Sequence, residues 1–282
     1  MKLFFCLFSL LLATSPTLSA QDPVAIMAKM KAALQRMNQS TFDLQSKERF
    51  GSTYATKNLR FRIQENPRRV YMKDLDTGVE MLYVVGWNGN KAYINPNGFP
   101  WVNVSLSIYD SKVVAENHHT VKDAGLGFVA LLLSGFESTV RKAGMAIDKL
   151  YTYKGEVIFD GRPCHRIYMI PPTGFEYVSY TTDRDQNLVQ LSRRIVASDY
   201  LIQEKNSKVS YARRIKKGTT LSVPSAYASK VIVYIDKQTY MPVVQMLYDE
   251  RGLFEKYEYR NINRRPDFDS KEFTTDCDKY GF

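Results

Sequence analysis

Cysteine and histidine are rare in this sequence, with three of each among 282 residues. The histidines are His118, His119 and His165, and no cysteine or carboxylate spacing around them supplies the four ligands of a structural zinc site. The sequence also lacks a glycine-rich phosphate-binding loop and the nucleophile elbow of the hydrolases. It therefore predicts no metal site, no cofactor and no catalytic residue, and we expect the protein not to be an enzyme.

The residues that come nearest to a catalytic arrangement are poorly placed for catalysis. His118 and His119 precede a predicted helix, where we expect them to cap the helix or to face solvent. Cys164 and His165 are neighbours on a predicted strand, and consecutive strand residues point to opposite faces, so they make a poor thiol–imidazole pair. Asp185 shares a turn with another aspartate, but no second carboxylate is identifiable across a sugar, as glycoside cleavage requires.

Long hydrophobic runs are absent apart from one at the N-terminus. Lys2 precedes the apolar run LFFCLFSLLLA, which is too short to span a bilayer comfortably, and TSPTLSA before QD resembles a cleavage site after Ala20. We therefore predict a signal peptide over residues 1–20 and export to the periplasm or cell envelope. Cys6 lies too near the start to carry a lipid anchor, and a retained membrane anchor is the weaker alternative, so no stable transmembrane anchor is expected.

Two cysteines remain after cleavage, Cys164 and Cys277. An exported chain meets an oxidising compartment, where these two residues can form one disulfide. The alternative is two separate buried thiols, because the sequence does not show whether the two Cα atoms come close enough to be bridged.

Acidic residues are fewer than basic ones, 29 against 39, which gives a formal net charge of +10. Residues 179–224 alone contain nine basic and four acidic residues. A basic surface favours anionic partners such as cell-wall polymers and lipid headgroups. Nucleic acid is not expected as a partner, because the protein is predicted to be exported.

The remaining pattern is that of a sheet protein. Aromatic residues make up 13% of the chain and include 19 tyrosines, which suit a pleated surface. A first helix is predicted after Asp22, and hairpin signals such as Asn88-Gly89 then separate short alternating segments. WVNVSLSI, residues 101–108, alternates as a half-buried antiparallel strand does. Further strands are predicted at NLRFRI, YMKDL, EMLYVVGWN, KAYIN, YKGEVIFDGRPCHRIYMIPP, FEYVSY and three segments between residues 229 and 268.

Residues 120–144 interrupt the strands with a dense apolar helical pattern. So many apolar residues indicate a helix that packs inside a curved sheet. Gly125, Gly127 and Gly135 cost helix stability but permit a close approach to another backbone or to a ligand.

A second interruption lies between residues 179 and 226, where the apolar spacing becomes helical and basic residues gather. The order strand, helix, helix, strand resembles a LysM domain, with residues 180–182 as its first strand and residues 188–195 as its first helix. Residues 202–206 match the end of its second helix and the asparagine that follows. The closing motif I-x-x-G-x-x-L-x-V-P is matched by Ile215, Gly218, Leu221, Val223 and Pro224.

The LysM resemblance implies a groove for glycans that contain N-acetylglucosamine, and hence peptidoglycan as a partner. This sequence departs from the family where Gly-Asp-Thr is usual and Asp185-Gln186-Asn187 stands instead, which puts the ligand in doubt. A long structured loop is the alternative to an inserted domain. The groove residues that the resemblance implies are Asp185, Gln186, Asn187, Asn206 and Ser207.

Residues 21–178 and 227–282 form the predicted host domain, which resembles the LolA/LolB-like lipoprotein carriers. The resemblance is carried by YID before a turn, a proline that opens the next strand, and YEY in the last strand. VYMKDLDTGVEMLYVVGWNGNKAYINP and the ending FTTDCDKYGF are similar to an exported bacterial family of unknown function in that superfamily. The resemblance implies an α+β fold, mainly β, in which a curved, open antiparallel half-barrel wraps around short helices.

The same resemblance places the internal helix against an apolar concave face that must be filled or bind a ligand. We therefore expect a monomeric, non-enzymatic binding protein for a lipid, an acyl chain or a lipidated protein. Two alternatives stay open: a structural cell-wall-associated protein with a filled core, and a hydrolase of wall glycan or wall peptides. The predicted cavity-lining residues, for each of which ordinary core packing is the alternative, are Leu126, Phe128, Leu132, Leu133 and Phe136.

Overall fold

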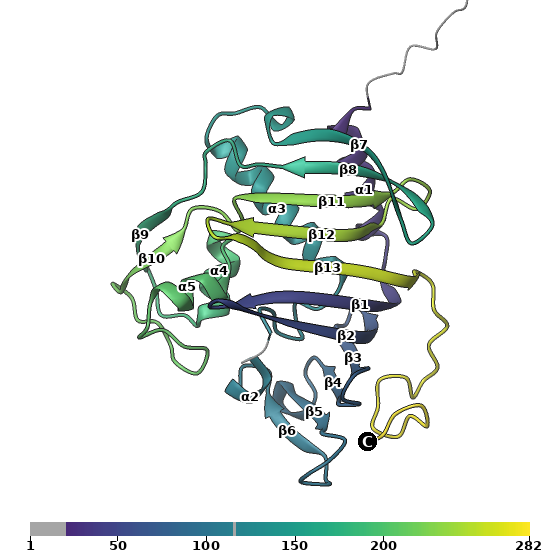
Figure 1. Cartoon of the computed structure of the whole chain (residues 1–282). Coiled ribbons are helices and arrows are strands. Elements are labelled where there is room, and N and C mark those ends of the chain that lie inside the picture. Colours follow the sequence, from purple (N-terminus) through teal and green to yellow (C-terminus); the bar gives the residue numbers. More distant parts are fainter. Residues whose placement is uncertain (1–20, 115–116) are drawn as a thin grey trace, which may run out of the picture.

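The computed structural model describes residues 21–114 and 117–282, so the predicted signal peptide lies outside the described residues. An open, curved eleven-stranded antiparallel sheet runs through the molecule (Figure 1), which confirms the predicted fold class. Strands β6 and β7 form its edges, and β1 and β13 are neighbours near its middle. In spatial order the strands are β6 (Val104–Ser107), β5 (Lys91–Asn95), β4 (Glu80–Val84), β3 (Arg69–Asp74), β2 (Thr53–Gln64), β1 (Gln39–Phe50), β13 (Gly252–Asn263), β12 (Pro242–Asp249), β11 (Lys230–Asp236), β8 (Arg162–Met169) and β7 (Tyr151–Phe159).

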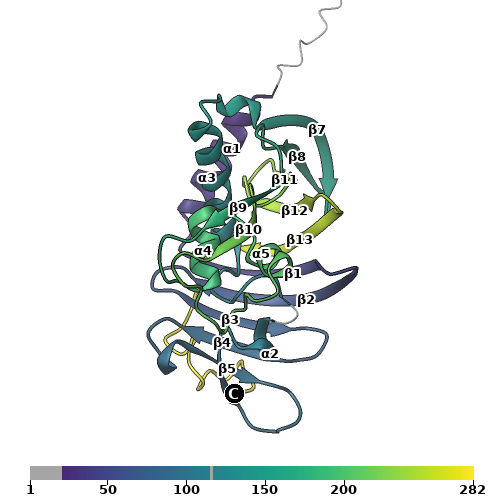
Figure 2. The same cartoon turned by 90° about the vertical axis from the view of Figure 1, so that its left-hand side faces the viewer.

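Helices α1 (Pro23–Gln35) and α3 (Leu126–Lys142) lie side by side on one face of the sheet (Figure 2). The Asp22 side chain caps α1 by accepting a hydrogen bond from the backbone N–H of Val24 at 2.9 Å, as its sequence position predicts. Helix α3 starts later than residue 120 because Gly125 adopts φ +96°, and a Cβ there would lie 2.6 Å from Ile63. The main hydrophobic core forms between these helices and the sheet.

Strand β1 lies in the middle of the sheet, where the N-terminal and C-terminal strands of the chain meet. It pairs with β2 on one side and with the last strand, β13, on the other. Its inward positions are occupied by Ser40, Phe42, Leu44, Ser46 and Glu48, all of which are buried. The sequence patterns did not identify this strand, because polar residues stand at three of the positions where an apolar residue would mark a buried face.

The second interruption has the predicted order of strand, helix, helix, strand, and it has a hydrophobic cluster of its own. Its strands form a separate two-stranded antiparallel sheet. Asn187 and Gln190 build a reciprocal capping box at the start of its first helix. We call this segment the insert; its elements are β9 (Tyr177–Thr181), α4 (Leu188–Ile195), α5 (Asp199–Lys205) and β10 (Thr220–Pro224).

Cys164 and Cys277 are free, buried thiols, so the predicted disulfide is wrong and the alternative of two separate thiols holds. Cys164 lies on β8. The carbonyl of Cys277 accepts a hydrogen bond from Tyr280, whose ring stacks on Tyr71 of β3. Strands β3 and β8 are six positions apart in the sheet, or roughly 25–30 Å at about 4.8 Å per strand, far beyond the reach of a disulfide.

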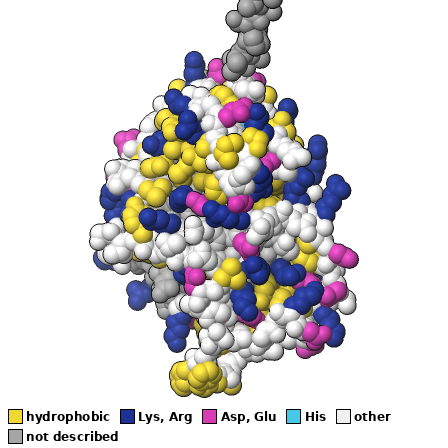
Figure 3. Space-filling model, turned by 45° about the vertical axis from the view of Figure 1, so that its right-hand side comes forward, with side chains coloured by type: hydrophobic (Ala, Val, Ile, Leu, Met, Phe, Trp, Pro, Cys, Tyr) yellow, Lys and Arg dark blue, Asp and Glu magenta, His cyan; other side chains and the backbone are white. Residues whose placement is uncertain are grey.

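The loop between β5 and β6 projects as an apolar tip. Phe99, Trp101 and Val102 are 85%, 79% and 61% exposed, and Figure 3 shows hydrophobic side chains at the lower end of the molecule, where this loop lies. The strand predicted at residues 101–108 is shorter than expected, because β6 spans only Val104–Ser107. Among the described residues, no helix is long and apolar enough to cross a membrane.

Candidate ligand-binding cavity

A cavity of about 100 Å³ lies between α3 and the inner face of the sheet. Its floor comes from β1 to β4, β12 and β13, and its roof comes from α3 and the segment before it. The walls are mostly apolar, as the concave face of a half-barrel predicts. The apolar side chains that line the cavity include Leu44, Leu59, Phe61, Met72, Met81 and Val129.

The five predicted cavity residues fall into two groups. Phe128 and Leu132 line the cavity, whereas Leu126, Leu133 and Phe136 lie in the main hydrophobic core and not in the cavity wall. Phe128 and Leu132 are four positions apart on α3, so they point to the same side of the helix. That Phe128 and Leu132 contact a lipid stays a prediction.

The cavity has one polar end, built where β1 pairs with β13. The register places Glu48 directly opposite Glu255, and Ser46 opposite Tyr257. Glu48 is 7% exposed and Glu255 is 0% exposed. Tyr257 donates a hydrogen bond to Oε1 of Glu48 at 2.6 Å. Two buried carboxylates therefore face each other across the middle of the sheet, where like charges are unfavourable unless they are compensated.

His118 compensates both carboxylates. Its backbone N–H donates to Oε2 of Glu48 at 2.8 Å, and its ring contacts Oε1 of Glu255 through Nδ1 at 2.9 Å and the carbonyl of Arg49 through Nε2 at 2.8 Å. Both ring nitrogens of His118 therefore contact hydrogen-bond acceptors, and the buried ring is held between β1 and β13. The expectation that His118 caps a helix or faces solvent is wrong, because its side chain is completely buried.

His119 adds a positive group beside Glu255. Its Nε2 atom lies 3.4 Å from Oε2 of Glu255 and 3.2 Å from the hydroxyl of Tyr227. Burial by itself lowers the pKa of His119, but the Glu255 carboxylate outweighs burial and raises this pKa to about 9. Burial raises the pKa of Glu255, and the neighbouring His119 and His118 outweigh that effect and lower it to about 2. The expected solvent-facing place of His119 is wrong as well.

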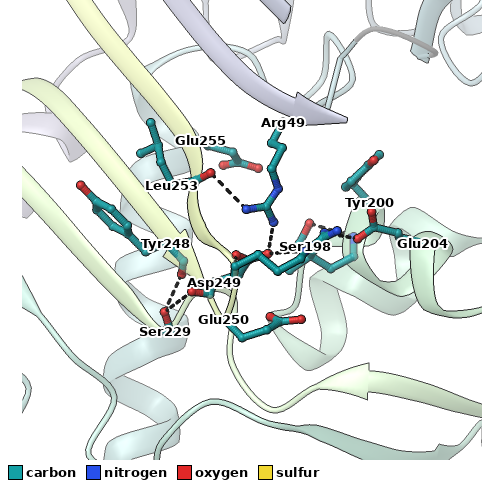
Figure 4. A network of polar contacts seen from close by, with 12 residues as sticks. Arg49, Ser198, Tyr200, Glu204, Ser229, Tyr248, Asp249, Glu250, Leu253 and Glu255 are labelled. Carbon is teal, nitrogen blue, oxygen red and sulfur yellow. Dashed lines mark hydrogen bonds and ion pairs between the residues drawn. The ribbon is translucent and has the colours of Figure 1, made fainter. Parts of the chain in front are cut away.

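The insert packs against this polar end. The ring of Tyr200, on α5, stacks on His118 with 4.2 Å between ring centroids. Arg49 forms an ion pair with Asp249 and donates to the carbonyl of Leu253 at 3.2 Å, so it links β1 to the turn between β12 and β13 (Figure 4). In the same view, that turn reaches α5 of the insert beside Tyr200.

Helix α4 of the insert reaches the helical roof of the cavity. Arg193 forms an ion pair with Asp123 and lies over the ring of Phe128, 4.4 Å from its centroid. Asp123 and Phe128 both line the cavity, so Arg193 braces its roof. Asp199, at the start of α5, is 1% exposed, and burial raises its pKa.

Four of the five predicted glycan-groove residues make contacts within the insert or are buried in it. Asn187 caps α4, and Asn206 holds α5 to β10 through two hydrogen bonds from its side-chain nitrogen, at 2.7 Å to the carbonyl of Ile202 and 2.8 Å to that of Ser222. Gln186 is 3% exposed. Asp185 is exposed and accepts a hydrogen bond from the backbone N–H of Lys217 at 2.9 Å.

A separate surface groove lies along the insert. Asn206 and Ser207 line it, but Asp185, Gln186 and Asn187 do not. Its other lining residues include five cations and no carboxylate; the five are Lys205, Lys208, Arg213, Arg214 and Lys216.

Sequence reasoning missed the polar end of the cavity. Glu48 on β1 is far in the sequence from Gln245, Glu255 and Tyr257 on β12 and β13, and only the pairing of β1 with β13 brings these residues together. The signal in the sequence that could have revealed this site is a polar residue at an inward-facing position of a strand that otherwise alternates between apolar and polar residues. Within residues 21–114 and 117–282, no group of three or more His, Cys, Asp or Glu side chains is arranged to hold a metal ion.

Several solved structures are similar to this chain at low sequence identity. Crystal structures of LprF from Mycobacterium bovis (TM-score 0.42, 11% identity, 87% of this chain and 94% of that chain) and of a LolA superfamily protein from Nitrosomonas europaea (TM-score 0.33, 10% identity, 91% and 99%) are two of them. A third is MucB (TM-score 0.41, 12% identity), of which the match covers 91% of this chain and 63% of that chain. A comparison with curated proteins found no match.

The sequence was also compared with models of protein families. The model described as "Protein of unknown function (DUF1571)" matches residues 37–191. The match runs from the residues just before β1 into α4 of the insert and covers more than half of the chain. The chain therefore belongs to the DUF1571 family, a family of unknown function, as the sequence resemblance predicted.

Proposed function

We propose that this protein is an exported, non-enzymatic binding protein of the cell envelope whose cavity holds the acyl chain of a lipid or of a lipidated protein. The observation that carries the proposal is the apolar cavity between α3 and the inner face of the sheet. A pocket with apolar walls and a few convergent polar groups is the usual form of a site for a small amphiphile.

The size of the cavity sets a condition on binding. At about 100 Å³ it is smaller than the ~150 Å³ apolar cavity that accommodates benzene in a well-studied case. An acyl chain therefore enters only when α3 moves outward from the sheet. Burial of ten methylene groups would contribute about 8 kcal/mol, at about 0.8 kcal/mol per group, which can offset such a displacement.

The ionisable groups of the cavity support binding rather than catalysis. A general acid or base works best when its pKa lies near the working pH. The pKa of Glu255 is lowered to about 2 and that of His119 is raised to about 9. At neutral pH both groups stay charged as a fixed ion pair, so they are poorly suited to exchanging protons with a substrate.

The test is a pair of matched substitutions on α3. Leu132 lines the cavity, whereas its neighbour Leu131 is 48% exposed and does not. We expect Leu132→Trp to fill the cavity and to weaken the binding of a fluorescent fatty acid at least tenfold, and Leu131→Trp to leave binding unchanged. Wild-type protein that neither binds the probe nor co-purifies with lipid would exclude the carrier function and favour a structural protein with a filled core.

We further propose that the insert binds peptidoglycan, as its LysM-like sequence implies. The groove that contains Asn206 and Ser207 supports this proposal, because its cationic lining suits an anionic wall polymer. The insert would then hold the binding protein at the cell wall.

A further inference from the structure

We infer that the polar end of the cavity binds the uncharged carbonyl oxygen that joins an acyl chain to its headgroup, as in an O-acyl ester or an N-acyl amide. This inference rests on the proposed function, because it assumes that a chain occupies the apolar part of the cavity. To the proposed function it adds the kind of chemical group that is attached to the end of the acyl chain.

The acceptors at this end are the carboxylate oxygens of Glu48 and Glu255. Glu48 accepts from Tyr257 and from the backbone N–H of His118. Glu255 accepts from the His118 ring at 2.9 Å, from Tyr227 at 3.2 Å and from the His119 ring at 3.4 Å. Each carboxylate oxygen already has a donor, so neither residue needs a ligand.

Two buried donors at this end of the cavity make no close hydrogen bond among the described residues. They are Nε2 of Gln245 and Nδ1 of His119, although the Gln245 side chain interacts more weakly with the Tyr259 hydroxyl. Gln245 is only 5% exposed. Both residues line the cavity. A buried donor without an acceptor is costly, so two at one site indicate a group that the site is built to receive.

Both donors lie beside Tyr257. Gln245 is the direct neighbour of Tyr257 in the β12–β13 register. The ring of His119 lies 5.9 Å from the ring of Tyr257. The donors therefore belong to one polar wall, at the boundary with the apolar lining from Leu44 and Leu247.

The charges at this end select among possible headgroups. Two buried carboxylates, Glu48 and Glu255, already lie here, and a ligand carboxylate would add a third anion in a buried environment. An alkylamine would bring further donors to a site whose carboxylate oxygens already accept hydrogen bonds. A neutral carbonyl supplies the acceptor without adding charge, and one or two hydrogen bonds to it correspond to about tenfold or more in affinity.

The experiment compares three ligands of equal chain length on the full mature protein: methyl decanoate, decanoate and decylamine. Each competes with a fluorescent chain probe, and the readout is its dissociation constant. We expect methyl decanoate to bind about tenfold more tightly than the other two. The variant Gln245→Leu, which removes the donor and keeps the volume, should weaken methyl decanoate about tenfold and leave decylamine unchanged.

A second readout separates a binding role from a structural one. Because Nε2 of Gln245 is buried and makes no close hydrogen bond, its removal should raise the Tm of the ligand-free protein by a few degrees while it weakens the ester. Gln45→Leu, the same change at an exposed position of β1, is the matched control and should not alter ester binding. Equal affinities for all three ligands, or an unchanged affinity of Gln245→Leu for the ester, would overturn the inference and leave chain binding intact. If wild-type protein bound none of the three, the proposed function itself would fail.

Discussion

At the scale of single residues, the opposed carboxylates of Glu48 and Glu255 dominate the electrostatics of the cavity. Their repulsion is strengthened by burial, because the effective dielectric constant is lower inside the protein than in water. His118 binds both carboxylates, and His119 binds the second. The charge of Glu255 is therefore balanced by His119 only while the His119 ring is protonated.

This balance makes stability depend on pH. The folded protein holds the pKa of His119 at about 9, against 6.5 for a free histidine, so its contribution is complete below pH 6.5 and is lost as the pH rises to 9. The pKa of Glu255 is about 2 instead of 4.5, so its contribution is complete above pH 4.5 and is lost below that value. We expect the free energy of unfolding to be highest between pH 4.5 and 6.5 and to fall by on the order of 3 kcal/mol by pH 9. Urea unfolding at pH 6 and pH 9 measures this difference.

Two histidine variants distinguish the cluster from other titrating groups. His119→Gln should abolish most of the loss of stability between pH 6 and pH 9. His165→Gln removes a histidine whose pKa is lowered, chiefly by burial, and the alkaline loss should persist in it. An alkaline loss of the same size in His119→Gln as in the wild type would place its origin elsewhere.

At the scale of elements, the decisive contact is the one between α3 and the insert. Gly135 of α3 lies against Val196 at the end of α4, so closely that a Cβ atom on Gly135 would overlap the valine side chain. This explains why a glycine, which weakens a helix, stands in the middle of α3. The insert thus packs directly on the helix that covers the cavity.

We expect Gly135→Ala to separate α4 from α3. Alanine favours the helix by about 1 kcal/mol, but the overlap with Val196 costs more, about 1–3 kcal/mol. Hydrogen exchange of the α4 backbone amides should therefore become faster, while exchange in β11 and β12 stays as it is.

Two further variants test whether this contact is the cause. Ser134→Ala is the control on the same helix, because Ser134 is exposed. The double variant Gly135→Ala/Val196→Ala should restore slow exchange in α4, since the smaller side chain makes room for the added methyl group. No recovery in the double variant would argue against a direct contact.

Elements with a regular apolar period could be predicted from the sequence, and those that carry the site could not. Helix α1, helix α3 and the order of the insert follow from spacing, caps and turns. Strand β1 was missed because Ser46 and Glu48 replace apolar residues on its buried face. The polar residues that build the polar end of the cavity are thus also the reason why β1 could not be predicted from its sequence pattern.

The partners across the sheet also lie beyond sequence reasoning. Glu48 and Glu255 meet because β1 pairs with β13 in one particular register. A shift of one residue between the two strands would place the two carboxylates on opposite faces of the sheet. Nothing within either segment alone specifies that pairing. The possible disulfide does not form for a similar reason, since Cys164 lies on β8, whereas Cys277 lies in the segment after β13, near β3.

At the scale of the whole molecule, the host and the insert present different surfaces. The groove of the insert is cationic. The most exposed hydrophobic side chains belong instead to the loop between β5 and β6, which also contains Asn97 and Asn103. No charged residue occurs from position 92 to position 109. One protein thus combines a surface that suits anionic polymers with a tip that is uncharged and apolar.

We expect the insert to be responsible for binding to purified sacculi. The double variant Lys208→Gln/Arg213→Gln removes two exposed charges from the groove and should reduce the bound fraction several-fold. The readout is a pull-down at low and at high salt, because screening weakens contacts that are only electrostatic.

The control for this pull-down keeps the total charge equal. Lys91→Gln/Lys142→Gln removes two exposed charges from the host and should leave binding as it is. Binding that disappears at high salt, or that falls equally in both double variants, would show nonspecific attraction to a basic protein and would remove the support for a glycan groove.

The pairing of β1 with β13 also has a consequence for how the protein matures. The hydrogen bond between Tyr257 and Glu48 joins residues 209 positions apart, and a nascent chain that emerges N-terminus first exposes β1 long before β13 has been made. Until then β1 has an unpaired edge, which invites contact with other chains. Closing the sheet and assembling the polar end of the cavity are therefore one late event, so the newly made protein gains its ligand site only when its final strand is in place.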